Sequence, residues 1–146
     1  MGRLRGAEAE LARDYCARAT AAGRALGLGP VEVVEVETRK PGKPAEAESL
    51  LAAADDALLV ACDEHGRAHA SRAFADKVAG WRDAGERRVA FLIGGADGLD
   101  PALVARARET LAFGPQTWPH ALARAMLAEQ LYRAVTLIGG SPYHRD

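Results

Sequence analysis

Apolar residues recur at helical spacing near the start of the chain. From Ala7 to about Leu26 strong helix formers predominate, and the run ends at the glycines and the proline of residues 27–30. This pattern predicts an amphipathic first helix. Its expected apolar stripe consists of Leu11, Tyr15, Ala19 and Ala22.

Four later segments have the pattern of β-strands. Residues 31–36 alternate valine and glutamate, which is typical of a half-exposed strand. Residues 57–62 and 88–93 are short, continuous apolar runs, as in strands that are covered on both faces. A brief strand is also expected near residues 111–113.

Helices are expected between these strands and after them. Pro44, Pro101 and Pro119 each fit the first turn of a helix, and Asp100 is a suitable N-cap. Because buried strands and helices alternate, we predict right-handed crossovers and an α/β fold with a mainly parallel sheet flanked by helices. The predicted helices cover about residues 44–54, 71–84, 101–108 and 119–134.

Length and composition indicate one globular domain, residues 1–146. Hydrophobic residues make up 49% of the chain and charged residues 27%, which argues against disorder. The sequence shows no signal-peptide pattern and no long apolar run, so we expect a cytoplasmic protein without a membrane span. Cys16 and Cys62 lack metal-ligand spacing and are too few for a disulfide framework, so we interpret them as reduced core residues and predict no metal site.

The net charge of -1 does not by itself indicate a nucleic-acid-binding protein, because neutralising phosphates requires a basic surplus. Local basic clusters do occur, and a symmetric dimer would bring copies of them together. Each cluster alone is more typical of a solvated face than of an RNA contact. The clusters are Arg3, Arg5 and Arg13; Arg39, Lys40 and Lys43; and Arg82, Arg87 and Arg88.

A buried strand that runs into glycines is the first candidate site. Residues 91–99 read Phe-Leu-Ile-Gly-Gly-Ala-Asp-Gly-Leu. Ligands of open α/β sheets lie beyond the carboxyl ends of the strands, and glycine lets backbone amides approach a ligand closely. The spacing matches neither a dinucleotide fingerprint nor a phosphate-binding P-loop, so for this segment alone a tight strand-to-helix turn is the better interpretation.

Residues 113–119, Phe-Gly-Pro-Gln-Thr-Trp-Pro, form the second candidate. A glycine and two prolines fix an irregular backbone there, and its unpaired amides and carbonyls suit an adenine edge or a ribose. A rigid connecting loop is an equally good interpretation. Trp118 is also more typical of packing than of stacking on a ligand.

The last helix and the tail form the third candidate. The helix is apolar nearly all round, which indicates a central helix or a subunit interface. Polar groups in such a segment cost free energy unless they are partnered, so a cluster of them favours a site. The alternative is a set of caps, surface charges and a frayed end, and for His120 capping or packing competes with catalysis. The polar residues are His120, Arg124, Glu129, Gln130, Tyr132, Arg133, Tyr143, His144 and Arg145.

These segments contain three blocks whose order and separations match one known pattern. The first is Leu-Ile-Gly-Gly at residues 92–95, followed by Gly98 and Leu99. The second is Pro-His-x-Leu-x-Arg at residues 119–124, which continues into Glu-Gln-Leu-Tyr-Arg-Ala at residues 129–134. The third is the ending Pro-Tyr-His-Arg at residues 142–145. Together they resemble the RlmH family of bacterial ribosomal RNA methyltransferases, which belongs to the SPOUT class of trefoil-knotted enzymes.

The resemblance implies an enzyme that uses S-adenosylmethionine to methylate N3 of a pseudouridine in 23S rRNA on the assembled ribosome, as a homodimer. It also implies that the C-terminal segments thread through a knot around the cofactor loops. The implied cofactor contacts are Cys62, where the family commonly has Leu, Gly95, and the loop residues Gly114, Pro115, Gln116, Thr117, Trp118 and Pro119.

The residues of the tail suit the chemistry that this resemblance implies. N3 has to lose its proton and lie in line with the methyl carbon, at about 3 to 3.5 Å. A cation beside the base would stabilise the anion and a histidine could relay the proton, so the candidate catalytic residues are Arg145, His144 and Arg124. Tyr143 could stack on the base or orient it.

The chain differs from the family's pattern at its start. Members of the family begin with a strand that ends near an Ala-Val-Gly turn, whereas Met-Gly-Arg-Leu-Arg at residues 1–5 resembles the stretch just after that strand. We therefore expect the family's first strand to be missing, either through a late start-site assignment or through real loss. Two other functions stay open: a SPOUT methyltransferase with another RNA target, and a non-catalytic module that binds nucleotide or RNA.

Overall fold

The computed structural model describes residues 5–143, which form two compact units, each built from separate stretches of the chain. We call the first the sheet unit; it contains Val34–Ala68 and Glu86–His120. The second, the helical unit, contains residues 5–33, His69–Gly85 and residues 121–143. The prediction that residues 1–146 form a single domain stays a prediction.

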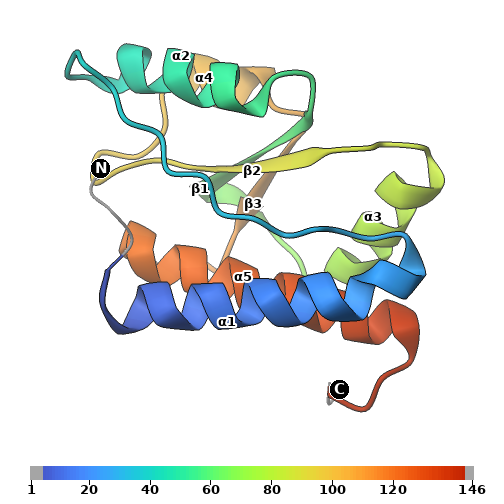
Figure 1. Ribbon diagram of the computed structural model, residues 1–146. Coiled ribbons are helices and arrows are strands. Elements are labelled where there is room, and N and C mark those ends of the chain that lie inside the picture. The colour runs from blue at the N-terminus through green and yellow to red at the C-terminus, as the bar shows by residue number, and fades with distance from the viewer. Residues whose placement is uncertain (1–4, 144–146) are drawn as a thin grey trace. The chain divides into compact units, whose positions relative to one another are not determined.

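A three-stranded parallel sheet organises the sheet unit, which confirms the predicted α/β class. The strand order is β2-β1-β3, so the first strand in the chain lies in the middle. Helices α2 and α4 lie together on one side of this sheet (Figure 1). The elements are α2 (Lys43–Ala54), β1 (Leu58–Ala68), β2 (Val89–Ile93), α4 (Pro101–Arg106) and β3 (Glu109–Ala112).

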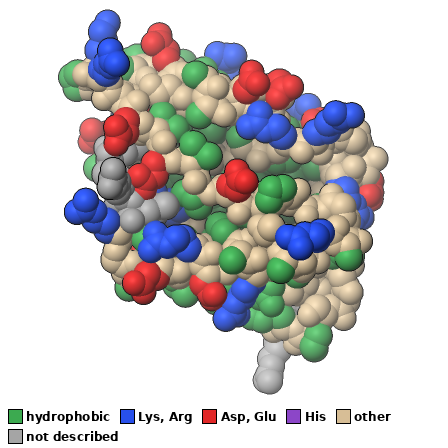
Figure 2. Space-filling model, viewed as in Figure 1, with side chains coloured by type: hydrophobic (Ala, Val, Ile, Leu, Met, Phe, Trp, Pro, Cys, Tyr) green, Lys and Arg blue, Asp and Glu red, His purple; other side chains and the backbone are tan. Residues whose placement is uncertain are grey.

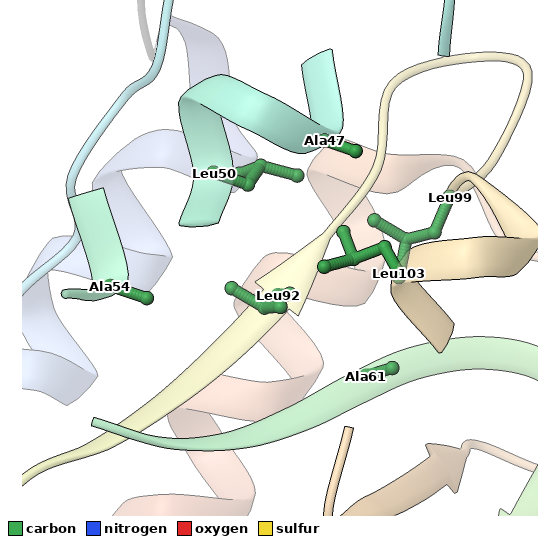
Figure 3. Close-up of a cluster of buried hydrophobic side chains, with 7 residues drawn as sticks. All are labelled: Ala47, Leu50, Ala54, Ala61, Leu92, Leu99 and Leu103. Atoms are coloured by element: carbon green, nitrogen blue, oxygen red, sulfur yellow. The ribbon is translucent and has the colours of Figure 1, made fainter. Parts of the chain in front are cut away.

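The apolar core of the sheet unit explains why the short apolar runs form the strands β1 and β2. Leu92 on β2 and Ala61 on β1 face residues of α2 and α4, and the two strand residues are 5% and 0% exposed (Figure 3). Burial of apolar area is the main favourable term in folding, so this cluster fixes which face of the sheet is covered. The cluster consists of Ala47, Leu50, Ala54, Ala61, Leu92, Leu99 and Leu103.

The helices of the sheet unit begin where the sequence predicts them to begin. Asp100 accepts a hydrogen bond from the Ala102 amide at 2.8 Å, and Pro101 occupies the first turn of α4. Pro44 likewise lies in the first turn of α2. The side-chain cap satisfies one of the amides that every helix N-terminus leaves without an intrahelical partner.

The helical unit contains α1 (Gly6–Gly23), the short 3-10 helix η1 (Arg24–Leu26), α3 (Ser71–Asp83) and the part of α5 (His120–Gly139) that follows His120. Helices α1 and α5 run side by side in the same direction (Figure 1). Ala12 and Cys16 of α1 pack against Ala125 and Ala128 of α5. All four predicted helical stretches after residue 40 and the first helix are thus confirmed, although α5 extends five residues beyond residue 134.

The buried stripe of α1 differs from the expected one. Leu11 is 47% exposed and Ala22 is also exposed. Of the expected stripe, Ala19 is buried and Tyr15 is half-buried. The other buried positions are Ala9, Ala12, Cys16 and Gly23. Small side chains let two helices approach closely, so the stripe that faces α5 is the one with the smallest residues rather than the most apolar ones.

The expected strand over residues 31–36 is wrong, because the structure assigns no strand there. The Val31 amide donates to Thr20 Oγ1 at 2.9 Å, and Val34 is 68% exposed. A strand needs a neighbour to pair with its backbone, and within residues 5–143 none is placed beside this segment. The alternating pattern predicts neither the pairing nor the exposure of this segment, since Val33 and Val34 are exposed and Glu35 is half-buried.

The structure also extends β1 beyond its apolar run and shifts β3. Strand β1 continues through polar residues to Ala68, six residues past the predicted end at Cys62. Strand β3 begins at Glu109, two residues before the predicted start. The prediction that the family's first strand is missing stays a prediction, since residues 1–4 lie outside the described range. Among the described helices, none has the length and apolar character needed to cross a membrane.

Candidate functional site

The carboxyl ends of the three strands lie at one edge of the sheet. Cys62 on β1 is level with Ile93, the last residue of β2, and also with Leu111, one residue before the end of β3. The segments that leave β2 and β3 therefore begin beside each other, at the level of Cys62. This is the edge at which open parallel sheets bind ligands.

The loop after β2 depends on the small size of its glycines. A Cβ at Gly94 would lie 2.6 Å from the carbonyl carbon of Gly98 and 2.8 Å from the Leu99 nitrogen, which no real side chain tolerates. The Gly98 amide donates to the Gly95 carbonyl at 3.0 Å, and Gly98 has a φ of 80°. The loop is thus a tight reversal whose backbone is exposed to an approaching ligand because no side chains intervene.

A carboxylate from α2 holds the amide of this loop. Gly95 N–H donates to Glu46 Oε1 at 3.1 Å, and Glu46 lies in the first turn of α2. A charged acceptor makes a stronger hydrogen bond than a neutral one. Glu46 therefore fixes the orientation of the predicted cofactor residue Gly95 from outside the loop.

The loop after β3 is closed by its own tryptophan. Trp118 Nε1 donates to the Phe113 carbonyl at 3.1 Å, and the Trp118 side chain is about one third exposed, at 36%. Gly114 has a φ of 95°, a conformation that favours glycine. Thr117 Oγ1 donates to Glu64 in the segment that extends β1. The predicted cofactor residues 114–119 thus form a fixed loop that is tied to β1.

Cys62 is half-buried at the level of the strand ends, and burial raises the pKa of its thiol from 9.0 to about 12. The thiol is therefore protonated at neutral pH and behaves as a small apolar group. Directly after it the pairing with β3 is irregular, because Cys62 and Arg67 both pair with Leu111. Residues 63–66 form a bulge, and the close approach of Gly66 to the Leu111 backbone leaves no room for a Cβ.

All predicted cofactor residues consequently lie in the sheet unit, on the segments at or after the three strand ends. Hydrogen bonds from Thr117 to Glu64 and from Gly95 to Glu46 hold two of these segments in place. The backbone amides and carbonyls of glycine-rich loops, and a half-buried apolar thiol beside them, suit a ligand with both polar and apolar parts.

The helical unit contains the predicted residues Tyr143 and Arg124. Tyr143 donates its hydroxyl proton to Glu129 Oε2 at 2.8 Å. Arg133 also binds Glu129, through Nη2 at 2.7 Å and Nε at 3.3 Å, and this contact raises the pKa of Arg133. Burial first, and then hydrogen bonds with Tyr15 and Glu129, raise the pKa of Tyr143 above its ordinary value. At neutral pH Tyr143 is therefore a hydrogen-bond donor.

Three aromatic rings and two guanidinium groups stack beside this carboxylate. The ring centroids of Tyr132 and Tyr143 are 4.6 Å apart, and those of Tyr15 and Tyr132 are 6.0 Å apart. Arg133 lies 5.2 Å from the centroid of Tyr143, and Arg18 lies 5.6 Å from that of Tyr15. Cations at these distances from a ring face are attracted by its π-electrons.

Arg124 differs from these residues, because its buried Nε has no hydrogen-bond partner within the described part of the chain. A buried donor without a partner costs free energy, which is consistent with a group that awaits a ligand. His120, the first residue of α5, belongs to the sheet unit. The predicted catalytic residues His144 and Arg145 lie outside the described residues.

Sequence reasoning missed three carboxylates that hold the candidate segments. Glu46 and Glu64 are ordinary acidic residues of a helix and a strand, and no spacing signal distinguishes them. Glu129 was noted as a polar residue of the last helix, but its contact with Tyr143 joins residues 14 positions apart. Only the fold of residues 139–143 brings these two together.

The surface carries both signs of charge. On the face shown in Figure 2, lysine and arginine side chains are interspersed with aspartate and glutamate. This agrees with the net charge of -1 and gives no single-sign field on that face. Among residues 5–143, no three His, Cys, Asp or Glu side chains are grouped so that they could hold a metal ion.

Comparison with known proteins gives matches over the whole chain. A family model described as "Predicted SPOUT methyltransferase" matches residues 1–144. A protein of Phenylobacterium zucineum (strain HLK1) is 70% identical over 147 residues, which cover 100% of this chain and 96% of the relative. A protein of Caulobacter sp. (strain K31) is 67% identical over 146 residues, covering 100% and 94%. A third, from Dinoroseobacter shibae, is 57% identical over 148 residues, covering 99% and 95%. All three are named ribosomal RNA large subunit methyltransferase H.

Proposed function

Because this chain belongs to the SPOUT methyltransferase family, we propose that it methylates N3 of a pseudouridine in the 23S rRNA of the assembled ribosome, with S-adenosylmethionine as the methyl donor. The names of its relatives, which are up to 70% identical over the whole chain, support a large-subunit rRNA target. The structural observation that carries the proposal is the alignment of three strand ends at Cys62, where the predicted cofactor residues converge.

In this proposal the sheet unit binds the donor. When bound, S-adenosylmethionine supplies a methyl group on a sulfonium, which is electrophilic. Cys62 offers an apolar contact, residues 114–119 offer backbone amides and carbonyls, and Gly95, whose amide is held by Glu46, offers the free lone pair of its carbonyl. Glu46 and Glu64 keep these loops in place, so that little reorganisation accompanies binding.

In this proposal, residues of the tail and of α5 orient and deprotonate the base. N3 of the pseudouridine loses a proton, the N3–methyl bond forms and the bond from the methyl carbon to sulfur breaks. We assign the proton to His144, the stabilisation of the developing anion to Arg145 and Arg124, and the orientation of the base to Tyr143. The unpartnered Nε of Arg124 supports its assignment as a group that binds charge.

We further propose that the enzyme acts as a cytoplasmic homodimer. Ribosomes are its proposed substrate, and a chain with a net charge of -1 needs more basic surface than one copy provides. A symmetric pair would place two copies of each basic cluster on the RNA. The trefoil knot of the SPOUT class belongs to the same proposal.

Calorimetry with S-adenosylmethionine tests the first part of the proposal. We expect one site per chain with the folded wild-type protein, and binding that is weakened by substitution in the loops of the sheet unit. A folded protein that gives no heat of binding at saturating donor would contradict the methyltransferase assignment.

Methylation of ribosomes tests the target. Mass mapping of 23S rRNA after incubation of ribosomes from a deletion strain should show one pseudouridine that gains a methyl group. Arg145→Ala should abolish this gain while leaving donor binding unchanged, and Arg106→Ala, an exposed arginine of α4, should preserve both. Methylation of a different RNA would favour a SPOUT enzyme with another target, and donor binding without transfer to any RNA would favour a binding module.

A further inference from the structure

We infer that Glu129 is a positioning residue for the proposed transfer reaction, because its carboxylate anchors Tyr143, the residue proposed to orient the base, onto α5. The inference rests on the proposed function for its consequence. The anchor itself rests on contacts within the helical unit.

Donors from three residues converge on the Glu129 carboxylate. Arg133 binds both oxygens, at 2.7 and 3.3 Å, and Gln130 Nε2 donates to Oε1 at 3.1 Å. The Tyr143 hydroxyl donates to Oε2 at 2.8 Å. The Glu129 and Arg133 side chains are only 19% and 26% exposed, so water screens these bonds less than it screens bonds on an open surface. The carboxylate is thus fixed by its own helix before it receives the tyrosine.

The anchor is braced by a second helix. Ser71, the first residue of α3, donates its hydroxyl proton to Gln130 Oε1 at 2.8 Å. Because this bond occupies the amide oxygen, the amide nitrogen of Gln130 is directed at Glu129. A chain of hydrogen bonds therefore runs from α3 through α5 to Tyr143.

The ring of Tyr143 is held as well as its hydroxyl. Tyr132 lies on one side, with ring centroids 4.6 Å apart, and the Arg133 guanidinium lies 5.2 Å from the ring centroid. Contacts at two ends of one side chain remove most of its rotational freedom. The side chain of Tyr143 is consequently held in one orientation beside α5.

The orientation of Tyr143 matters because the proposed function assigns to this side chain the orientation of the base. A misplacement of about 1 Å can lower the rate of a reaction about 100-fold.

Glu129→Gln tests the anchor with little change of shape, and Tyr143→Phe removes only the hydroxyl group. For the Tyr143 amide, we expect an NMR order parameter of about 0.85 in the wild type that falls toward about 0.6 in both variants. Donor affinity should stay unchanged, since no cofactor candidate lies in the helical unit. On ribosomes kcat should fall by about 10- to 100-fold with a smaller change in KM.

Two further variants separate positioning from general destabilisation. Glu10→Gln, at an exposed glutamate of α1, should leave the order parameter and kcat as in the wild type. The double variant Glu129→Gln/Tyr143→Phe should lose less kcat than the two single losses combined, because both changes act on the same hydrogen bond.

Each outcome has one meaning. An unchanged order parameter in Glu129→Gln, or additive losses of kcat in the double variant, overturns the positioning role. A wild-type protein that methylates no ribosome overturns the proposed function, whereas the order parameters still report whether Glu129 anchors Tyr143.

Discussion

The two units hold their candidate residues by opposite means. In the sheet unit the loop after β2 exists because side chains are absent: a Cβ at Gly94 would collide with the Gly98 backbone. In the helical unit Tyr143 is held because side chains are present, through the carboxylate of Glu129 and the guanidinium of Arg133. Backbone geometry therefore limits substitution at Gly94 in the sheet unit, and charge limits substitution around Tyr143 in the helical unit.

This difference indicates what each half contributes to a transfer reaction. In the proposed function, the loop fixed by sterics binds the same small donor in every turnover and tolerates little variation. The network of side chains orients Tyr143 toward the base, and each of its bonds contributes modestly on its own. The predictions below challenge this contrast, beginning with the largest effect.

Loss of the core under the sheet should have the largest effect on stability. Leu103 is 1% exposed in the cluster between the sheet and its helices, so Leu103→Ala should lower the free energy of unfolding by about 2–5 kcal/mol. Chemical denaturation measures this loss. Leu11→Ala, at a leucine that is 47% exposed, is the control and should change stability by less than about 0.5 kcal/mol. Equal losses in the two variants would contradict the placement of this core.

Gly94→Ala should have the next largest effect. The added methyl group forces the loop after β2 to move, which should cost about 1–3 kcal/mol and weaken the binding of S-adenosylmethionine. Gly80→Ala is the matched control: nothing lies within 4 Å of a Cβ there, and alanine should stabilise α3 by about 0.5–1 kcal/mol. Donor affinity that is equal in the two variants would remove the loop from the site.

Glu46→Gln should destabilise the loop after β2 less than Gly94→Ala does. The amide oxygen of glutamine can still accept from the Gly95 amide, but the loss of charge should cost about 1 kcal/mol. Calorimetry should show weaker donor binding, because the loop is less well held. Glu48→Gln, an exposed glutamate of the same helix, should have no effect. An effect of the same size at Glu48 would assign the loss to overall charge.

Near neutral pH the smallest effect should come from Cys62, whose contribution to stability changes only at alkaline pH. Its pKa is higher in the folded chain, about 12 against 9.0, so the folded state holds the thiol proton more tightly. The stability that this gives is complete below about pH 9 and is lost as the pH rises toward 12. At about pH 8 the folded Cys16→Ser variant, which retains only Cys62, should react with an alkylating reagent more slowly than its unfolded form does. Equal rates would contradict the burial of this thiol.

Much of the fold could be predicted because its elements carry local signals. The continuous apolar runs that became β1 and β2 are buried in the structure as strand cores, and the Asp100–Pro101 pair sets the start of α4. The valine and glutamate alternation at residues 31–36 was misleading, because a strand depends on a partner that pairs with its backbone and a local pattern cannot supply one. The stripe of α1 was misjudged for a similar reason: packing against α5 selects small residues.

The candidate cofactor residues were found through glycine, proline and family resemblance, and the register of the sheet places their segments at one edge. The carboxylates that hold these segments in place were not predicted. Glu46 and Gly95 are 49 positions apart, and Glu64 and Thr117 are 53 apart, so no local pattern connects them. A carboxylate that supports a loop is indistinguishable in sequence from one that only faces water.

The bulge that follows Cys62 has a consequence for insertions and deletions in this strand. In a regular strand, one added or deleted residue turns every later side chain to the other face of the sheet. Here pairing with β3 stops at Cys62 and resumes at Arg67, against the same residue, Leu111. A codon gained or lost at residues 63–66 leaves the registers before and after this unpaired stretch unchanged, so we expect the strand to accept insertions there, beside the segments that are proposed to bind the donor.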